Sequence, residues 1–123
     1  MELRNYCESI LSENQLSRLA CDHDESDIKP PELNGCIPDL FLTDTSISLI
    51  GEAKTIADYQ TNHSMNQYIH YINFLKNKKN PHLIFSCRKK IKRTFSNMID
   101  TLMYSNRVDR DMFKIIFLEK TNL

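Results

Sequence analysis

The sequence has no long apolar run, no net charge and no closely spaced pair of cysteines. Its 123 residues contain no stretch near the roughly 18 apolar residues that a membrane-spanning helix needs. The first residues have neither the basic lead nor the apolar segment of a signal peptide. With 41% hydrophobic and 26% charged residues, the composition is that of an ordinary globular protein. We therefore expect a single domain over residues 1–123, cytoplasmic and without membrane association.

The cysteines are scattered and include no C-x-x-C pair. They are Cys7, Cys21, Cys36 and Cys87. Free buried thiols are expected rather than disulfides, because nothing indicates an oxidising compartment. A zinc site formed by Cys21, His23 and Cys36 is the alternative, although this spacing is not that of an established zinc motif.

The charges are segregated although they sum to zero. Residues 76–93 carry eight basic side chains and no acidic one, whereas residues 1–32 carry eight acidic and three basic side chains. A local basic stripe is typical of nucleic-acid binding, and a solvated basic face is the simpler alternative. The run "RKKIKR" opens a predicted helix, where cations oppose the helix dipole and backbone N–H groups attract anions. The predicted phosphate contacts are Arg88, Lys89, Lys90, Lys92 and Arg93.

The order of the expected elements indicates an α/β fold. Apolar residues recur at helical spacing in three segments, which are residues 2–20, 64–77 and 89–104. Alternating or continuous apolar runs predict strands at residues 38–44, 46–54, 82–87 and 113–119, with a further short edge strand around 28–34. The first two of these strands read as a hairpin, and the strand–helix–strand unit that follows requires a parallel pair. The result is a mixed sheet flanked by helices.

The helix expected at 64–77 is apolar on more than one side. Its core stripe consists of Met65, Tyr68, Ile69, Ile72 and Leu75. Ser64 and Gln67 are spaced as a capping box. At about 100° per residue, Tyr71 and Phe74 fall outside the stripe, so either the first helix or a second copy of the chain is expected to cover them. A two-fold homodimer is therefore one expected assembly.

The segment "GEAK" at 51–54 places charges at the end of the apolar run "SISLI". Residues i and i+2 of a strand share a face, so Glu52 and Lys54 project together. Asp39 opens the preceding strand, and hairpin pairing brings it beside Glu52. Oxygen donors suit Mg²⁺, so Asp39, Glu52 and the Ala53 carbonyl are candidate ligands. Lys54 is then placed to stabilise developing negative charge, and a plain surface ion pair between Glu52 and Lys54 is the alternative.

The stretch "IPDLFLTDTSISLIGEAK" resembles the signature of the PD-(D/E)XK nuclease superfamily, which is Pro-Asp, a hairpin and then Glu-x-Lys. The helix in "NHSMNQYIHYINFLK" is similar to one in the VRR-NUC and archaeal Holliday-junction-resolvase-like branches. The resemblance covers residues 2–87 and implies a restriction-endonuclease-like αβββαβ core. It implies a Mg²⁺- or Mn²⁺-dependent deoxyribonuclease that hydrolyses DNA phosphodiester bonds. The alternative is an inactive nuclease-fold module that binds nucleic acid or a protein partner.

The resemblance also assigns roles to individual residues. The resemblance implies that Asp39 and Glu52 are metal ligands and that Lys54 is the catalytic lysine. Members of the superfamily often add a glutamate from the first helix, which points to Glu8, with Glu13 as the alternative. Gln67 is implied to position the site or to bind DNA, whereas its role in a capping box explains it without such a function.

Overall fold

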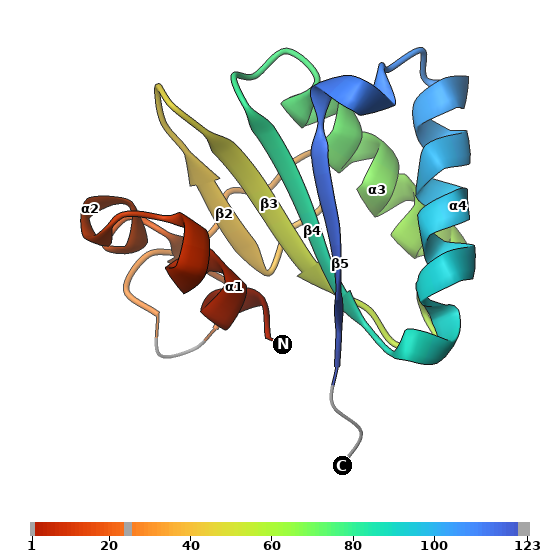
Figure 1. The fold of residues 1–123 in the computed structure, drawn as a ribbon, viewed down its shortest axis with the longest axis horizontal. Coiled ribbons are helices and arrows are strands. Elements are labelled where there is room, and N and C mark those ends of the chain that lie inside the picture. The colour runs from red at the N-terminus through yellow and green to blue at the C-terminus, as the bar shows by residue number, and fades with distance from the viewer. Residues whose placement is uncertain (1, 24–25, 121–123) are drawn as a thin grey trace.

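The computed structural model describes residues 2–23 and 26–120 (Figure 1). Its helices are α1 (Leu3–Ile10), α2 (Glu13–Leu16), α3 (Asn62–Leu75), α4 (Lys89–Ser105) and the short 3-10 helix η1 (Arg110–Met112). Its strands are β1 (Ala20–Cys21), β2 (Leu40–Thr43), β3 (Ser48–Ala53), β4 (Pro81–Cys87) and β5 (Lys114–Glu119). From β2 onward, each predicted element begins and ends within two residues of its expected bounds.

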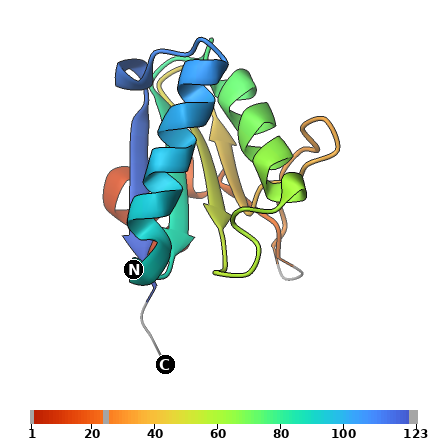
Figure 2. The same ribbon diagram turned by 90° about the vertical axis from the view of Figure 1, so that its right-hand side faces the viewer.

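The strands form one mixed sheet in the order β1-β2-β3-β4-β5. β1, β2 and β3 are antiparallel neighbours, whereas β3, β4 and β5 run parallel. The two parallel connections pass through α3 and α4, and both helices cover the same face (Figures 1 and 2), as successive crossovers of one hand require. α1 and α2 lie against the other face. The predicted α/β fold with a mixed sheet flanked by helices is therefore confirmed.

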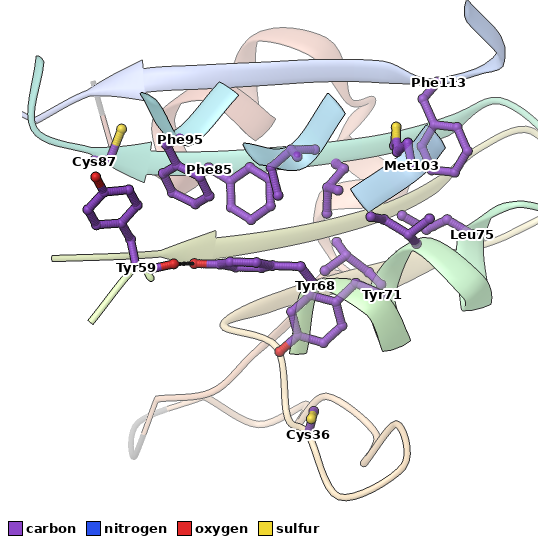
Figure 3. Packing of buried hydrophobic residues seen from close by; sticks show 14 of the residues in the cluster. Cys36, Tyr59, Tyr68, Tyr71, Leu75, Phe85, Cys87, Phe95, Met103 and Phe113 are labelled. Atoms are coloured by element: carbon purple, nitrogen blue, oxygen red, sulfur yellow. Dashed lines mark hydrogen bonds between the residues drawn. The ribbon is translucent and has the colours of Figure 1, made fainter. Parts of the chain in front are cut away.

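Each face of the sheet has its own apolar core. Aromatic side chains dominate the cluster beneath α3 and α4, where the Phe85 and Phe95 ring centroids lie 4.7 Å apart. Figure 3 shows this cluster and the hydrogen bond from the Tyr68 hydroxyl to the Tyr59 carbonyl. Aliphatic side chains from α1, β2 and β3 fill the other cluster. Because β3 lies between both layers, it is buried on both sides and carries its last residues to a sheltered edge.

The N-terminal segment differs from its prediction as one helix over residues 2–20. α1 ends at Ile10, and Ser12 starts α2 with a capping box in which its hydroxyl accepts from the Gln15 N–H. The chain then turns into β1, where Ala20 and Cys21 pair with β2. The apolar spacing continues across the break between α1 and α2. The Ser-x-x-Gln pattern, in contrast, marks the start of a second helix and so favours two short helices.

The prediction of an edge strand around residues 28–34 is wrong. The edge of the sheet beside β2 is β1 instead. Within the expected segment, the Ile28 carbonyl accepts from the Cys21 N–H, and Leu33 makes an isolated bridge with Cys36 around a turn. Asn34 and Gly35 have positive φ angles of 51° and 84°, a conformation that ends an extended strand.

The apolar side of α3 that suggested a second subunit is covered by this chain itself. Tyr71 is fully buried, and the Phe74 ring lies 5.5 Å from that of Phe41 in β2. Leu33 and Cys36 pack against the same cluster. α1 lies on the opposite face of the sheet from α3 (Figure 1). Neither α1 nor a second copy of the chain is therefore needed to cover Tyr71 and Phe74, and this side of α3 gives no support for a homodimer. Through the part of the chain that the structure describes, no helix is both long and apolar enough to span a bilayer.

Candidate functional site

Asp39 and Glu52 meet where β2 begins and β3 ends. Leu40 pairs with Gly51 in the antiparallel ladder, so the next positions outward are Asp39 and Glu52. The half-buried Asp39 carboxylate accepts a hydrogen bond of 2.7 Å through Oδ2 from the Ala53 backbone N–H. Gly51 permits this close pairing, since a Cβ there would lie 3.2 Å from the Leu40 Cβ. The structure thus brings together the two carboxylates that the hairpin pattern predicts to be neighbours.

The Ala53 backbone is directed toward Asp39. In an extended strand, the N–H and C=O of one residue point to the same side. The Ala53 N–H bonds to Asp39 on the β2 side, whereas the Lys54 N–H bonds to the Ser86 carbonyl on the β4 side. The Ala53 carbonyl therefore faces the same side as the Asp39 carboxylate.

The Glu52 side chain is enclosed on the α3 face, and the residue is 6% exposed. The Tyr71 hydroxyl donates a hydrogen bond of 3.0 Å to Oε1, and the Lys54 Nζ lies 3.8 Å from Oε2. The pKa of Glu52 is raised from 4.5 to about 7, chiefly by burial and then by the Asp39 charge, whereas Lys54 opposes the shift. Burial also raises the pKa of Asp39, against the hydrogen bond from Ala53. Near neutral pH, Glu52 therefore exchanges between acid and carboxylate.

Lys54 is 4% exposed and has polar neighbours on α3. Its Nζ donates a hydrogen bond of 2.9 Å to the Ser64 Oγ and a second, short one to the Gln67 Oε1. The ammonium also lies 5.6 Å from the centroid of the Tyr68 ring. Because these partners and Tyr71 recur at positions i, i+3, i+4 and i+7, one face of α3 holds both Glu52 of β3 and Lys54, which follows β3.

The capping-box interpretation of Ser64 and Gln67 is wrong. α3 begins earlier, and Thr61 caps it by accepting from the Ser64 N–H. Both side chains bind Lys54 instead. Gln67 is 7% exposed, so it is enclosed beside the lysine rather than presented to a nucleic acid. The spacing of the two polar residues along an otherwise apolar helix indicates that they share one face. It does not indicate which residue they bind.

The first-helix glutamates do not join the carboxylate pair. Glu8 is exposed, and its Oε1 lies 3.8 Å from the Arg4 Nε in the same helix. Glu13 opens α2, which the Gln15 side chain ties to Asp44 in the hairpin turn, at the opposite end of the hairpin from the candidate site. A helical face predicts which side a residue takes, but not how far along the sheet the helix lies.

The zinc alternative has no support, because Cys21, His23 and Cys36 do not form a group. Over residues 2–23 and 26–120, no three His, Cys, Asp or Glu side chains come together as a metal site. The four cysteines are free thiols, as expected, and all of them except the half-buried Cys21 are buried. Two carboxylates and a carbonyl are nonetheless a donor set that fits Mg²⁺ or Mn²⁺, since Mg²⁺ is commonly held by one or two carboxylates with waters and phosphate oxygens.

A cavity of about 1010 Å³ opens on the α1 face beside this site. Asp39 and Ala53 belong to its lining, and Glu2, Arg4 and Lys120 border it with them. The sequence does not predict Glu2, Arg4 or Lys120 as residues of this cavity. Strand parity carries a signal for Lys120, because it follows the inward-facing Leu118 by two residues at the end of the last strand.

The basic run begins at the same edge of the sheet. α4 starts directly after β4, with Arg88 as its N-cap residue (Figure 1). Lys89, Lys90 and Arg93 are exposed, whereas Lys92 is half-buried with its Nζ 3.3 Å from the Glu119 Oε1. Four of the five predicted phosphate contacts are therefore exposed, and Lys92 shares its charge with a carboxylate.

The arrangement combines two carboxylates of raised pKa, a buried ammonium and exposed cations at one sheet edge. Such a set can bind a divalent cation and an anionic group together. No protein-family model matches the chain, and comparisons with curated proteins and with solved structures give no match either.

Proposed function

We propose that the protein is a Mg²⁺- or Mn²⁺-dependent nuclease with the restriction-endonuclease-like arrangement of the PD-(D/E)XK superfamily. The observation that carries the proposal is the meeting of Asp39, Glu52 and Lys54 at the carboxyl end of β3. Each of the three is held by a contact of its own: Asp39 by the Ala53 N–H, Glu52 by Tyr71 and Lys54 by α3. A fortuitous surface pair would be exposed and mobile, whereas Glu52 and Lys54 are buried.

Asp39, Glu52 and the Ala53 carbonyl would hold the cation, because all three are hard oxygen donors. Bound there, the cation would neutralise phosphate charge and lower the pKa of a water molecule. Lys54 supplies a fixed positive charge beside Glu52, which stabilises negative charge that builds on a phosphoryl oxygen. Its two hydrogen bonds to α3 fix the ammonium, so little reorganisation is needed during the reaction.

DNA is the proposed substrate because exposed cations begin at the same sheet edge. The backbone N–H groups at the start of α4 and the side chains of Lys89 and Lys90 suit phosphate oxygens. Phosphate contacts of this kind fix position without reading sequence.

The burial of Glu52 and Lys54 favours a second candidate function. At 6% and 4% exposure, with partners on α3, the two side chains satisfy one another without a ligand. An inactive nuclease-fold module that binds nucleic acid has this property. It differs from the nuclease in one measurable respect, since its binding to DNA would be indifferent to Mg²⁺.

The test is a cleavage panel of single-stranded, duplex, flap and junction DNA and of RNA, with Mg²⁺, Mn²⁺ or EDTA. The nuclease predicts metal-dependent cleavage of at least one DNA substrate, abolished in Asp39→Ala. Metal-independent binding with no cleavage of any substrate would instead establish the inactive module.

A further inference from the structure

The floor of the cavity on the α1 face includes residues that lie at or just beyond the ends of four neighbouring strands. Asp39 precedes β2, Ala53 ends β3, Ser86 lies near the end of β4 and Lys120 follows β5. Because the sheet order is β2-β3-β4-β5, these positions follow one another across the sheet edge. Three inter-strand spacings of 4.7–4.9 Å make this floor about 14 Å long.

Two cations border the cavity from different elements. Arg4 comes from α1, where its side chain is 48% exposed, and half-buried Lys120 is held at the end of β5 by a hydrogen bond of 2.8 Å from its N–H to the Cys87 carbonyl. The carboxylates of Glu2, Asp22 and Asp39 also border the cavity. Since these three acidic groups outnumber the two strong cations, the cavity attracts a phosphate group only when a divalent cation is bound beside Asp39.

We infer that this cavity binds a single nucleic-acid strand, with Arg4 and Lys120 contacting its phosphates, an inference that rests on the proposed function. A floor of about 14 Å corresponds to about four nucleotides at the 3.4 Å rise of one stacked strand. A volume of about 1010 Å³ matches the upper end of pockets that enclose small ligands, so it admits unpaired nucleotides. A duplex, whose major groove alone is about 12 Å wide, would lie over the rim and leave the floor unused.

The cavity lies on the opposite face of the sheet from Glu52 and Lys54. Ala53, Ser86 and Lys120 share the strand parity of the α1 face, whereas Glu52 and Lys54 point to α3. Asp39 is the residue that belongs to both, since it lines the cavity and neighbours Glu52. The strand therefore reaches Asp39 from the α1 side, and its path differs from that of the α4 basic run.

The test is binding of a fluorescent ten-residue oligothymidine, followed by anisotropy with Ca²⁺ or EDTA. Ca²⁺ takes the same oxygen ligands as Mg²⁺. Arg4→Ala and Lys120→Ala are compared with Lys114→Ala, an exposed lysine at the other end of β5. Arg4→Lys keeps the charge while changing the contacts of Arg4 in α1, and thermal melting verifies that each variant folds.

With Ca²⁺, Arg4→Ala and Lys120→Ala should each bind about tenfold more weakly, the effect of a lost hydrogen bond to a charged group. Each should also flatten the slope of log K against log salt by about 0.7. Lys114→Ala should bind as the wild type does, and Arg4→Lys should restore most of the binding that Arg4→Ala loses. Unchanged binding in both alanine variants, equal competition by a closed duplex, or equal binding in EDTA would overturn the inference.

The outcomes also separate this inference from the proposed function. Wild-type cleavage together with unaltered binding in the variants would reject the cavity and keep the nuclease. Binding that depends on Arg4 and Lys120 without any cleavage would keep the cavity and reject the nuclease.

Discussion

Glu52 should make the stability of the metal-free protein depend on pH between about 4.5 and 7. Its pKa is raised from 4.5 to about 7, chiefly by burial. A raised pKa in the folded state means that the stabilisation is complete below the unfolded pKa and is lost as pH rises through the folded one. At about 1.4 kcal/mol per pKa unit, the difference amounts to about 3 kcal/mol. The residue is 6% exposed, so solvent screening reduces this little.

The perturbation is Glu52→Gln, which keeps the shape of the side chain and removes its titration. Urea unfolding in EDTA at pH 5 and pH 8 gives the free energy of unfolding of each protein. Wild type should lose about 2.5 kcal/mol more than Glu52→Gln over this interval, because part of the loss already occurs below pH 5. Glu8→Gln, in an exposed carboxylate of α1, is the matched control and should follow the wild type. Equal losses in wild type and Glu52→Gln would refute the reasoning.

Three further predictions concern Tyr71, Gly51 and the exposed basic residues of α4. Tyr71→Phe removes the hydrogen-bond donor to Glu52, so it should destabilise the protein by about 1.5–3 kcal/mol at pH 8. The loss should be smaller at pH 5, where Glu52 is protonated, and urea unfolding at both pH values measures it. Gly51→Ala places a Cβ 3.2 Å from the Leu40 Cβ, so it should lower stability by about 1–3 kcal/mol in thermal melting; an unchanged melting temperature would contradict this. The triple change to Ala of the exposed basic residues of α4 should weaken duplex DNA binding and flatten its salt dependence, whereas an unchanged slope would make them a solvated face; the residues are Lys89, Lys90 and Arg93.

Much of the fold follows from local sequence signals. β3 and β4 are nearly continuous apolar runs because they are buried on both faces. In the sequence, α3 connects β3 to β4, and α4 connects β4 to β5. The hairpin register places Asp39 opposite Glu52 because a two-residue periodicity allows few alternatives. The N-terminal elements are less predictable, since a two-residue strand such as β1 depends on its partner β2 rather than on its own sequence.

The surroundings of the site depended on tertiary contacts that spacing does not encode. Gln67 and Tyr71 fell outside the expected core stripe, yet both are buried because they bind Lys54 and Glu52. The sequence shows two charged residues on a strand and two polar residues on a helix, but not that they face one another. Lys120 joins the cavity only because β5 ends beside β4, which is a property of the folded sheet.

The central claim is that Asp39 and Glu52 hold a cation while Lys54 serves the chemistry. The most direct measurement is calorimetric Mn²⁺ titration beside DNA cleavage for Asp39→Ala and Lys54→Met, the latter keeping much of the buried side-chain volume. Lys54→Met should bind Mn²⁺ yet cleave on the order of a hundredfold more slowly or worse. Asp39→Ala should lose Mn²⁺ binding and cleavage together. A wild type that cleaves DNA no faster than Lys54→Met, or an Asp39→Ala variant that binds Mn²⁺ as the wild type does, would contradict the account.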